Sequence, residues 1–318
     1  MYSMLSLIIG LLIILLIGLF LTIRLKIGKV ERLLFSFGIG TLVLFSILFI
    51  TNQYFKIAIN SFNIRLITII LFVFSLTYVL FSVSFKEFKR IIKETFKFKF
   101  ELDLFLILMI FLYFIVFYKS IFLPITTGDA TTMYAFSSKY TWQNGFIPIP
   151  SSALMEISYA FPNTNFIIIL ANYFFGINGS FSEFLFKILI PIFSILNLFL
   201  VYYISNKLFK NKIISRLAVA LLLSTIAFSA LLIQEYTVMF EIFFPLLALY
   251  SFILYDKSLN KKYFYLCSIF LGATLMSKYT IIPWVFGFLI LYLIYYRNSK
   301  NFILMGIISI ATSLIFYI

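Results

Sequence analysis

The chain has 318 residues, of which 63% are hydrophobic and only 11% are charged, and its formal net charge is +14. A water-soluble domain of this size needs more charged residues to cover its surface, so the composition excludes that class. The apolar runs of about 20 residues have the length of a helix that crosses a bilayer. The basic residues lie in the short gaps between these runs, as in membrane proteins, so we expect no nucleic acid partner.

The reactive side chains are few. Cys267 is the single cysteine, and the sequence contains no histidine. This excludes disulfides within the chain, Ser-His-Asp triads and zinc sites built from Cys or His ligands. Catalysis would have to use Asp, Glu, Lys or Tyr, and a divalent metal held by oxygen ligands stays an open alternative. We expect no other cofactor.

The apolar runs predict an all-α fold, a polytopic bundle of about ten transmembrane helices. The predicted spans are residues 4–23, 33–51, 64–83, 102–123, 184–205, 215–233, 237–255, 263–281, 283–296 and 301–318. The first span lacks the cleavage site of a signal peptide and is therefore interpreted as a membrane anchor. We expect residues 1–101 to form an N-terminal three-span region and residues 102–318 to form the transmembrane core.

The distribution of Lys and Arg predicts the orientation. Of the 25 basic residues, 19 lie in alternate gaps at 24–32, 86–99, 207–216, 257–262 and 297–300. The gaps with the basic excess face the cytoplasm in multi-pass proteins of the cell membrane. The N-terminus and the loop 124–183 are therefore predicted to lie outside. The six basic residues left on that side are Lys56, Arg65, Lys119, Lys139, Lys187 and Lys278.

Two segments are predicted to lie along the membrane surface. Residues 162–177 are apolar but must not cross, since crossing would move every later basic cluster outside; we expect a helix at the outer interface. Residues 85–101 are basic and amphipathic, which is typical of a helix on the inner leaflet that contacts anionic lipid. The long outer loop 124–183 is where we expect function to reside.

Acidic residues gather at the predicted outer level. Asp129 follows a Thr-Thr-Gly turn and fits the N-cap of a helix that Asn144-Gly145 would end; that structural role is one interpretation, and catalysis is the other. Glu235 lies in a tight outer turn. Glu241 lies about one turn inside the membrane, where a carboxylate has either a functional role or a structural hydrogen bond.

Lys278 is the matching cation, near the outer end of its span and just before Pro283. Its ammonium group would either extend to the interface or bind a phosphate, and the two interpretations are compatible.

Several motifs, in this order, resemble the GT-C glycosyltransferases that use polyprenyl-phosphate-linked sugars, such as the dolichyl-phosphate-mannose protein mannosyltransferases and the lipid A aminoarabinose transferase. The motifs are GDATTMYAF, YAFPNTNFIIILANYFFG, VYYISNKLFKNKIISRLA, ALLIQEYTVMFE and LGATLMSKYTIIPW, over residues 102–297. The sequence differs from the family pattern in two ways: the acid that opens the outer loop is single, without the paired Asp-x-Asp or Asp-Glu of some branches, and no histidine follows Tyr134. Three extra spans precede the resemblance, and the chain ends in an apolar run, as in a short or truncated family member.

The resemblance implies transfer of a sugar from a polyprenyl-phosphate donor to a glycan, lipid or protein acceptor on the outer face. Asp129 would be the general base or would orient the acceptor, and Glu235 or Glu241 would be a second carboxylate. Lys278 would stabilise the leaving phosphate. We also expect substrate binding by Tyr134, Lys139 and Tyr279. The alternatives are a polytopic transporter or lipid flippase, and a polysaccharide polymerase or ligase of the cell envelope.

Overall fold

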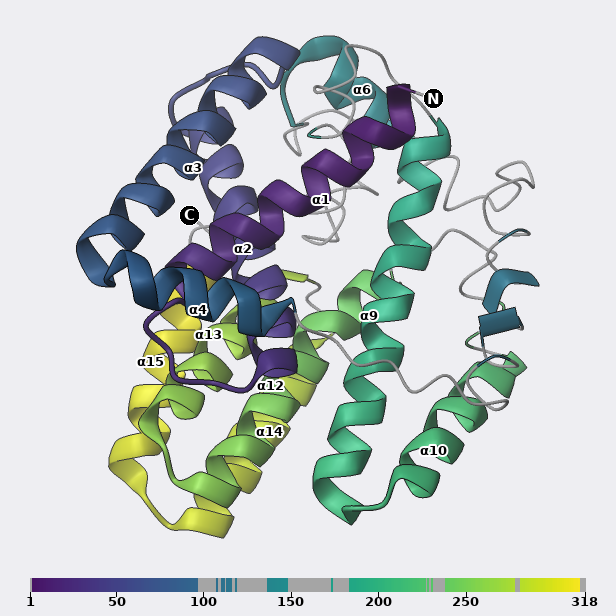
Figure 1. The fold of residues 1–318 in the computed structure, drawn as a ribbon, viewed down its shortest axis with the longest axis vertical. Helices are drawn as coiled ribbons and strands as arrows, with labels where there is room; N and C mark the ends of the chain where they lie inside the picture. Colours follow the sequence, from purple (N-terminus) through teal and green to yellow (C-terminus); the bar gives the residue numbers. More distant parts are fainter. Residues whose placement is uncertain are drawn as a thin grey trace. The chain divides into compact units, whose positions relative to one another are not determined.

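The computed structural model describes residues 2–96, 136–147, 183–226, 238–277 and 281–314, with isolated positions at 107, 110, 111, 113–115, 118, 173, 228 and 230. The elements of this part are all helices, as predicted. They are α1 (Tyr2–Leu21), α2 (Lys29–Gln53), α3 (Ser61–Ser82), α4 (Phe85–Thr95), α6 (Phe136–Asn144), α9 (Glu183–Phe209), α10 (Lys212–Ser224), α12 (Val238–Ser258), α13 (Lys261–Ser277), α14 (Ile282–Tyr296) and α15 (Ser299–Leu314) (Figure 1).

Among the described residues, four helices are long and apolar enough to cross a membrane: α2, α3, α9 from Lys187 onward, and α12. Shorter apolar helical stretches occur in α1, α14 and α15. All of them coincide with predicted spans. The predicted span 102–123 lies mostly outside the described residues, so the number of ten spans stays a prediction.

The chain forms two compact units. Unit 1 comprises Met1–Ile115, Ser138–Ile147 and Ile168–Phe186, and unit 2 comprises Val116–Ser137, Pro148–Ile167 and Lys187–Ile318. The predicted division at residue 101 stays a prediction.

In unit 1, small residues let α1 and α2 cross at close range. A Cβ atom added to Gly18 would lie 1.7 Å from the carbonyl oxygen of Ser36, and one added to Gly40 would lie 1.9 Å from that of Ile14. The hydroxyl groups of Thr22 and Ser36 share a hydrogen bond of 2.9 Å across the crossing. The two small residues on each side are four positions apart: Gly18 of α1 and Thr22 just after its end, and Ser36 and Gly40 of α2. This spacing is typical of helix contacts inside membranes, where packing rather than the hydrophobic effect drives association.

The predicted amphipathic helix is α4, which follows α3 after a sharp turn (Figure 1). The Ser84 hydroxyl caps it by accepting a hydrogen bond from the backbone N–H of Glu87 at 3.3 Å. The middle of its apolar face packs inward, since Ile91 is buried and Phe88 lies against Phe20. Only the ends of that face are left for lipid, at Phe85 and Phe96, which are exposed.

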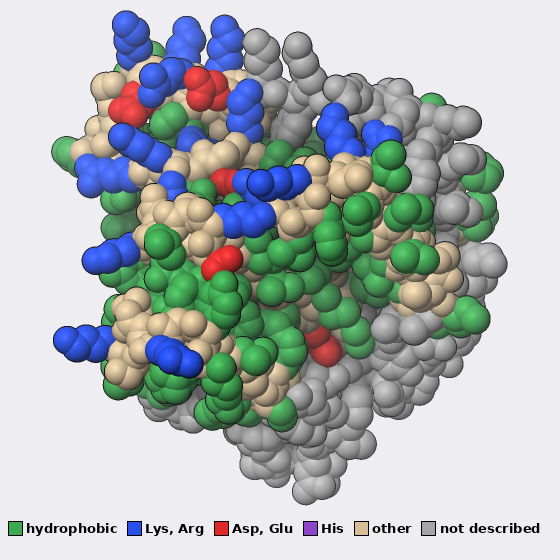
Figure 2. Space-filling model, turned by 90° about the horizontal axis from the view of Figure 1, so that it is seen from below, with side chains coloured by type: hydrophobic (Ala, Val, Ile, Leu, Met, Phe, Trp, Pro, Cys, Tyr) green, Lys and Arg blue, Asp and Glu red, His purple; other side chains and the backbone are tan. Residues whose placement is uncertain are grey.

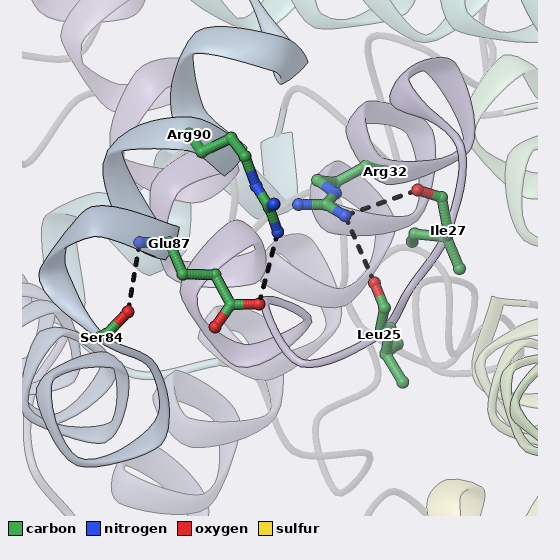
Figure 3. A network of polar contacts seen from close by, with 6 residues as sticks. All are labelled: Leu25, Ile27, Arg32, Ser84, Glu87 and Arg90. Atoms are coloured by element: carbon green, nitrogen blue, oxygen red, sulfur yellow. Dashed lines mark hydrogen bonds and ion pairs between the residues drawn. The ribbon is translucent and has the colours of Figure 1, made fainter.

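Polar contacts order the ends of helices near α4. Figure 3 shows the guanidinium group of Arg32 donating to the carbonyl oxygens of Leu25 and Ile27, at 3.4 Å each, which closes the connection between α1 and α2. On α4 itself, Arg90 pairs with Glu87 at 3.8 Å. This exposed pair contributes little to stability.

In unit 2, α13 is central and packs against α12, α14 and α15. Cys267, the single cysteine, lies in this helix and is fully buried. A Cβ atom added to Gly272 would lie 2.5 Å from Cβ of Thr312, and the Ser309 hydroxyl donates to the carbonyl oxygen of Ser268 at 2.9 Å. The α13–α15 contact thus repeats the small-residue crossing of unit 1.

The ends of α9, α12 and α14 lie close together in unit 2. The ammonium group of Lys257 donates to the carbonyl oxygen of Lys207, and the Tyr296 hydroxyl donates to Asp256 at 2.5 Å. These ends adjoin the basic gaps 207–216, 257–262 and 297–300, so the gaps gather at one end of the unit. Figure 2 shows Lys and Arg side chains, in blue, on the face seen from below.

Candidate functional site

Two of the seven predicted site residues, Lys139 and Glu241, lie in the part of the chain that the structure describes. They belong to different units, so each is considered within its own. The other five lie outside the described residues: Asp129, Tyr134, Glu235, Lys278 and Tyr279. The roles of all seven stay predictions.

Glu241 lies in the first turn of α12, and its side chain is buried. The helix begins beside α9, where the amide of Asn197 donates to the carbonyl oxygen of Met239 at 2.6 Å. The ring centroids of Phe193 and Phe240 lie 4.5 Å apart in the same contact. A carboxylate in the first turn of a helix is stabilised by the N-terminal end of the helix dipole. Glu241 is therefore an acid held in the protein interior rather than a surface charge.

A polar face of α9 is buried in the same unit. Lys187, Ser194 and Asn197 are all buried, and their spacing of seven and three positions puts them on one side of the helix. From the sequence, Lys187 is only one of the six basic residues on the predicted outer side. The signal that would have found it is the recurrence of polar residues at helical spacing in an apolar run. A buried ammonium group of this kind can pair with a phosphate or a carboxylate.

In unit 1, α6 carries Lys139 on its exposed side, whereas Ser138 and Thr141 are buried. The helix ends where predicted, because Gly145 adopts φ +75° and its N–H donates to the carbonyl oxygen of Thr141 at 2.8 Å. Lys139 is thus accessible to a charged ligand. The predicted N-cap at Asp129 lies outside the described residues.

The segment after α6 is bound to the end of α2 through Asn52, which is buried. The amide nitrogen of Asn52 donates to the carbonyl oxygens of Gly145 and Ile57, at 3.0 Å each, and its amide oxygen accepts from the N–H of Ile147 at 3.0 Å. The N–H of Ile59 also donates to the Gly145 carbonyl oxygen at 2.6 Å. We call this set of bonds the Asn52 clasp. It brings α6 and the α2–α3 connection to the same end of unit 1.

Metal binding was left open by the sequence. Across the described ranges, no three acidic, Cys or His side chains gather closely enough to hold a metal ion. A site of the kind considered above would need Asp129, Glu235 or another acid outside those ranges.

The comparisons with known proteins address the second half of the chain. Residues 162–318 match the family described as dolichyl-phosphate-mannose-protein mannosyltransferase. Over these residues the predicted GT-C resemblance is confirmed. The match indicates a membrane glycosyltransferase of the GT-C type. No curated protein matches the chain, and no solved structure does.

The GT-C match divides the predicted site. Glu235, Glu241, Lys278 and Tyr279 fall inside the matched range, whereas Asp129, Tyr134 and Lys139 precede it. Of the seven predicted site residues, Glu241 alone is both described by the structure and inside the matched range.

Proposed function

We propose that this protein is a GT-C-type glycosyltransferase that transfers a sugar from a polyprenyl-phosphate-linked donor to an acceptor on the outer face of the cell membrane. Support comes from the family match and from the apolar helices that would surround the prenyl chain. The single structural observation that carries the proposal is the buried carboxylate of Glu241 within the matched range. A buried carboxylate inside a membrane-spanning helix is costly, so it is a functional candidate by default.

The reaction follows from the location. Nucleotide sugars are cytosolic, so a transferase that works on the outer face needs a lipid-linked donor. An acceptor hydroxyl attacks the anomeric carbon, and the bond from that carbon to the phosphate oxygen breaks with its electron pair. The hydroxyl proton passes to a carboxylate, and polyprenyl phosphate leaves. The protein supplies orientation and charge compensation.

The proposed roles follow this chemistry. Asp129 accepts or orients the acceptor proton, since the chain has no histidine to do so. Glu241 or Glu235 is the second carboxylate, for the acceptor or a metal. Lys278 stabilises the departing phosphate, as a compact cation suits this role. Additional substrate contacts are assigned to Tyr134, Lys139 and Tyr279.

The outer-face assignment rests on the basic residues. In unit 2 the Lys257–Lys207 bond joins two basic gaps. In unit 1 Arg24 donates to the carbonyl oxygen of Ser82, just before the basic helix α4. A basic excess at one end of each unit supports a cytoplasmic side. The Asn52 clasp supports a common side for the α2–α3 connection and the loop that contains α6, as the predicted topology requires.

The Asp129→Asn variant tests the mechanism. We expect sugar transfer per purified molecule to fall by roughly 10²–10⁴-fold, the usual loss for a missing general base. Folding should lose at most about 1 kcal/mol, because asparagine also caps helices. The measurement is transfer of labelled sugar from a polyprenyl-phosphate donor, with the sugar chosen from the glycan that a deletion strain lacks.

The Asp129→Glu variant controls for geometry by keeping the charge. Activity of Asp129→Asn within a few-fold of wild type would leave Asp129 as an N-cap only and would make Glu235 and Glu241 the next candidates. A wild-type protein that transfers no sugar but moves the lipid across vesicles would favour the flippase alternative.

A further inference from the structure

The Asn52 clasp points to a role for the N-terminal helices, which precede the family match. We propose that Asn52 is a positioning residue that fixes α6, and through α6 the exposed Lys139, for binding of the polyprenyl-phosphate sugar. The activity part of this inference rests on the proposed function. The clasp itself can be tested without any sugar transfer.

The clasp uses both ends of one side-chain amide. Asn52 donates to the carbonyl oxygen of Gly145 and accepts from the N–H of Ile147, so it pairs with two backbone groups of the same short segment. Its second N–H donates to Ile57 in the α2–α3 connection. Only a side-chain amide offers a donor and an acceptor in this arrangement. Because Asn52 is buried, a substitution that removes its amide would leave the Ile147 N–H without this partner, whereas the Gly145 carbonyl oxygen would keep the bond from the Ile59 N–H.

The position of α6 depends on such contacts. The helix has nine residues, a length that is not stable by itself, so its place must be set by its packing and its ends. Its C-terminal end is held by the clasp, and its buried side is marked by Ser138 and Thr141. Lys139 precedes Gly145 by six residues, about 9 Å along a helix. A shift of the clasped end would therefore move the Lys139 ammonium group relative to unit 1.

The clasp also connects the N-terminal helices, which precede the family match, to the loop that contains α6. Asn52 comes from α2 and Ile57 and Ile59 from the α2–α3 connection, all before the matched residues 162–318. These helices would serve as a scaffold for the outer loop that precedes the matched region.

The Asn52→Asp variant breaks the clasp with minimal change of shape. The carboxylate can still accept from the N–H of Ile147 but faces the carbonyl oxygens of Gly145 and Ile57 without a proton to donate. Asn63→Asp is the matched control, because the amide of Asn63 donates to the carbonyl oxygen of Ala58 at 2.8 Å, within the same connection, rather than to the segment after α6. Both variants add the same charge beside the α2–α3 connection, Asn52→Asp near the end of α2 and Asn63→Asp near the start of α3.

The first measurement is hydrogen exchange of residues 145–147 in the full-length protein. We expect Asn52→Asp to speed exchange at Ile147 by about tenfold or more, because repulsion between the carboxylate and the Gly145 carbonyl oxygen would push the segment that carries the Ile147 N–H away from α2. Asn63→Asp should leave this exchange unchanged. Equal exchange in wild type and Asn52→Asp would overturn the clasp.

The second measurement is a kinetic cycle with Lys139→Met. We expect Asn52→Asp to raise the KM for the polyprenyl-phosphate sugar about tenfold, with kcat within a few-fold of wild type. The KM of the double variant should be no higher than that of the more impaired single variant. A variant that lowers only the amount of folded protein, with KM unchanged, would make Asn52 purely structural. Fully additive effects would remove Lys139 from the inference.

Failure of the proposed function gives a different pattern. No sugar transfer by the wild type would contradict the positioning role together with that function, whereas slow exchange at Ile147 would retain the clasp as an architectural contact.

Discussion

The helices α12 and α3 are both long and apolar enough to cross a membrane, yet they sit in opposite surroundings. In the most apolar 18-residue stretch of each helix, 72% of α12 and only 28% of α3 is buried inside the protein. Phenylalanines illustrate this difference: Phe243 and Phe244 of α12 are fully buried, whereas Phe74 and Phe81 of α3 are exposed. An apolar side chain is equally stable against lipid and against protein. The composition of a helix therefore predicts that it crosses the membrane, but not whether it contacts lipid or other helices.

Small and polar residues mark the contacts instead. The buried positions of α3 follow a helical stripe that includes Thr68 and Ser75, each bonded to a carbonyl oxygen one turn earlier. In α2 the corresponding markers are Ser36 and Gly40, at the crossing with α1. Such residues let backbones approach and find hydrogen-bond partners where lipid offers none.

The largest effect should come from Gly40→Leu, which would place a large side chain at the close approach of α2 to α1 in unit 1. The new side chain would start 1.9 Å from the carbonyl oxygen of Ile14, and a backbone atom cannot turn aside. We expect a loss of at least about 4 kcal/mol in stability, or no folded protein, in detergent unfolding curves.

Gly287→Leu in α14 is the control for that substitution, because no heavy atom lies within 4 Å of a Cβ atom built there. We expect it to fold as the wild type does. Equal damage from both variants would mean that leucine disturbs these helices for reasons other than the crossing.

The sequence predicted the fold as far as local signals reach. The apolar runs located α2, α3, α9 and α12, and Asn144-Gly145 located the end of α6. It could not predict that Phe88 of α4 packs on Phe20 while Phe85 is exposed, because both belong to one apolar face. Whether such a side chain contacts lipid or protein depends on which helices pack beside it, and local sequence patterns do not predict that packing.

The candidate site shows the same limit. Chemistry and motif order singled out Glu241; its side chain is buried, and its catalytic role stays a prediction. Lys187 was undervalued because a lysine near a helix end usually extends to the interface. Asn52 was missed because its partners Gly145 and Ile147 lie more than 90 residues away and present only backbone groups, which carry no sequence signal.

A smaller effect should separate Phe243→Ala from Phe74→Ala. Truncating Phe243 leaves a cavity beside Phe193, whose ring centroid lies 5.2 Å away, and we expect a loss of about 3 kcal/mol. Truncating the exposed Phe74 lets lipid fill the space, so the loss should stay below about 0.5 kcal/mol. Unfolding of both variants in the same lipid mixture measures the difference, and similar losses would show that α3 is covered by protein.

The smallest effect should come from the hydrogen bond between Thr22 and Ser36. Ser36→Ala removes one hydroxyl, but the Thr22 hydroxyl keeps a partner because it also donates to the carbonyl oxygen of Gly18 at 2.8 Å. Interhelical hydrogen bonds in membranes contribute about 0.6 kcal/mol on average, since the separated helices also find partners.

A double-mutant cycle with Thr22→Val isolates this bond. We expect a coupling free energy of about 0.6 kcal/mol between the two positions, far below the effect of Gly40→Leu only four residues further along α2. A coupling above about 2 kcal/mol would mean that the hydroxyl pair, and not the close approach of the two backbones, specifies the α1–α2 crossing. In that case polar pairing rather than residue size would be the feature that separates buried helices from lipid-facing ones in this protein.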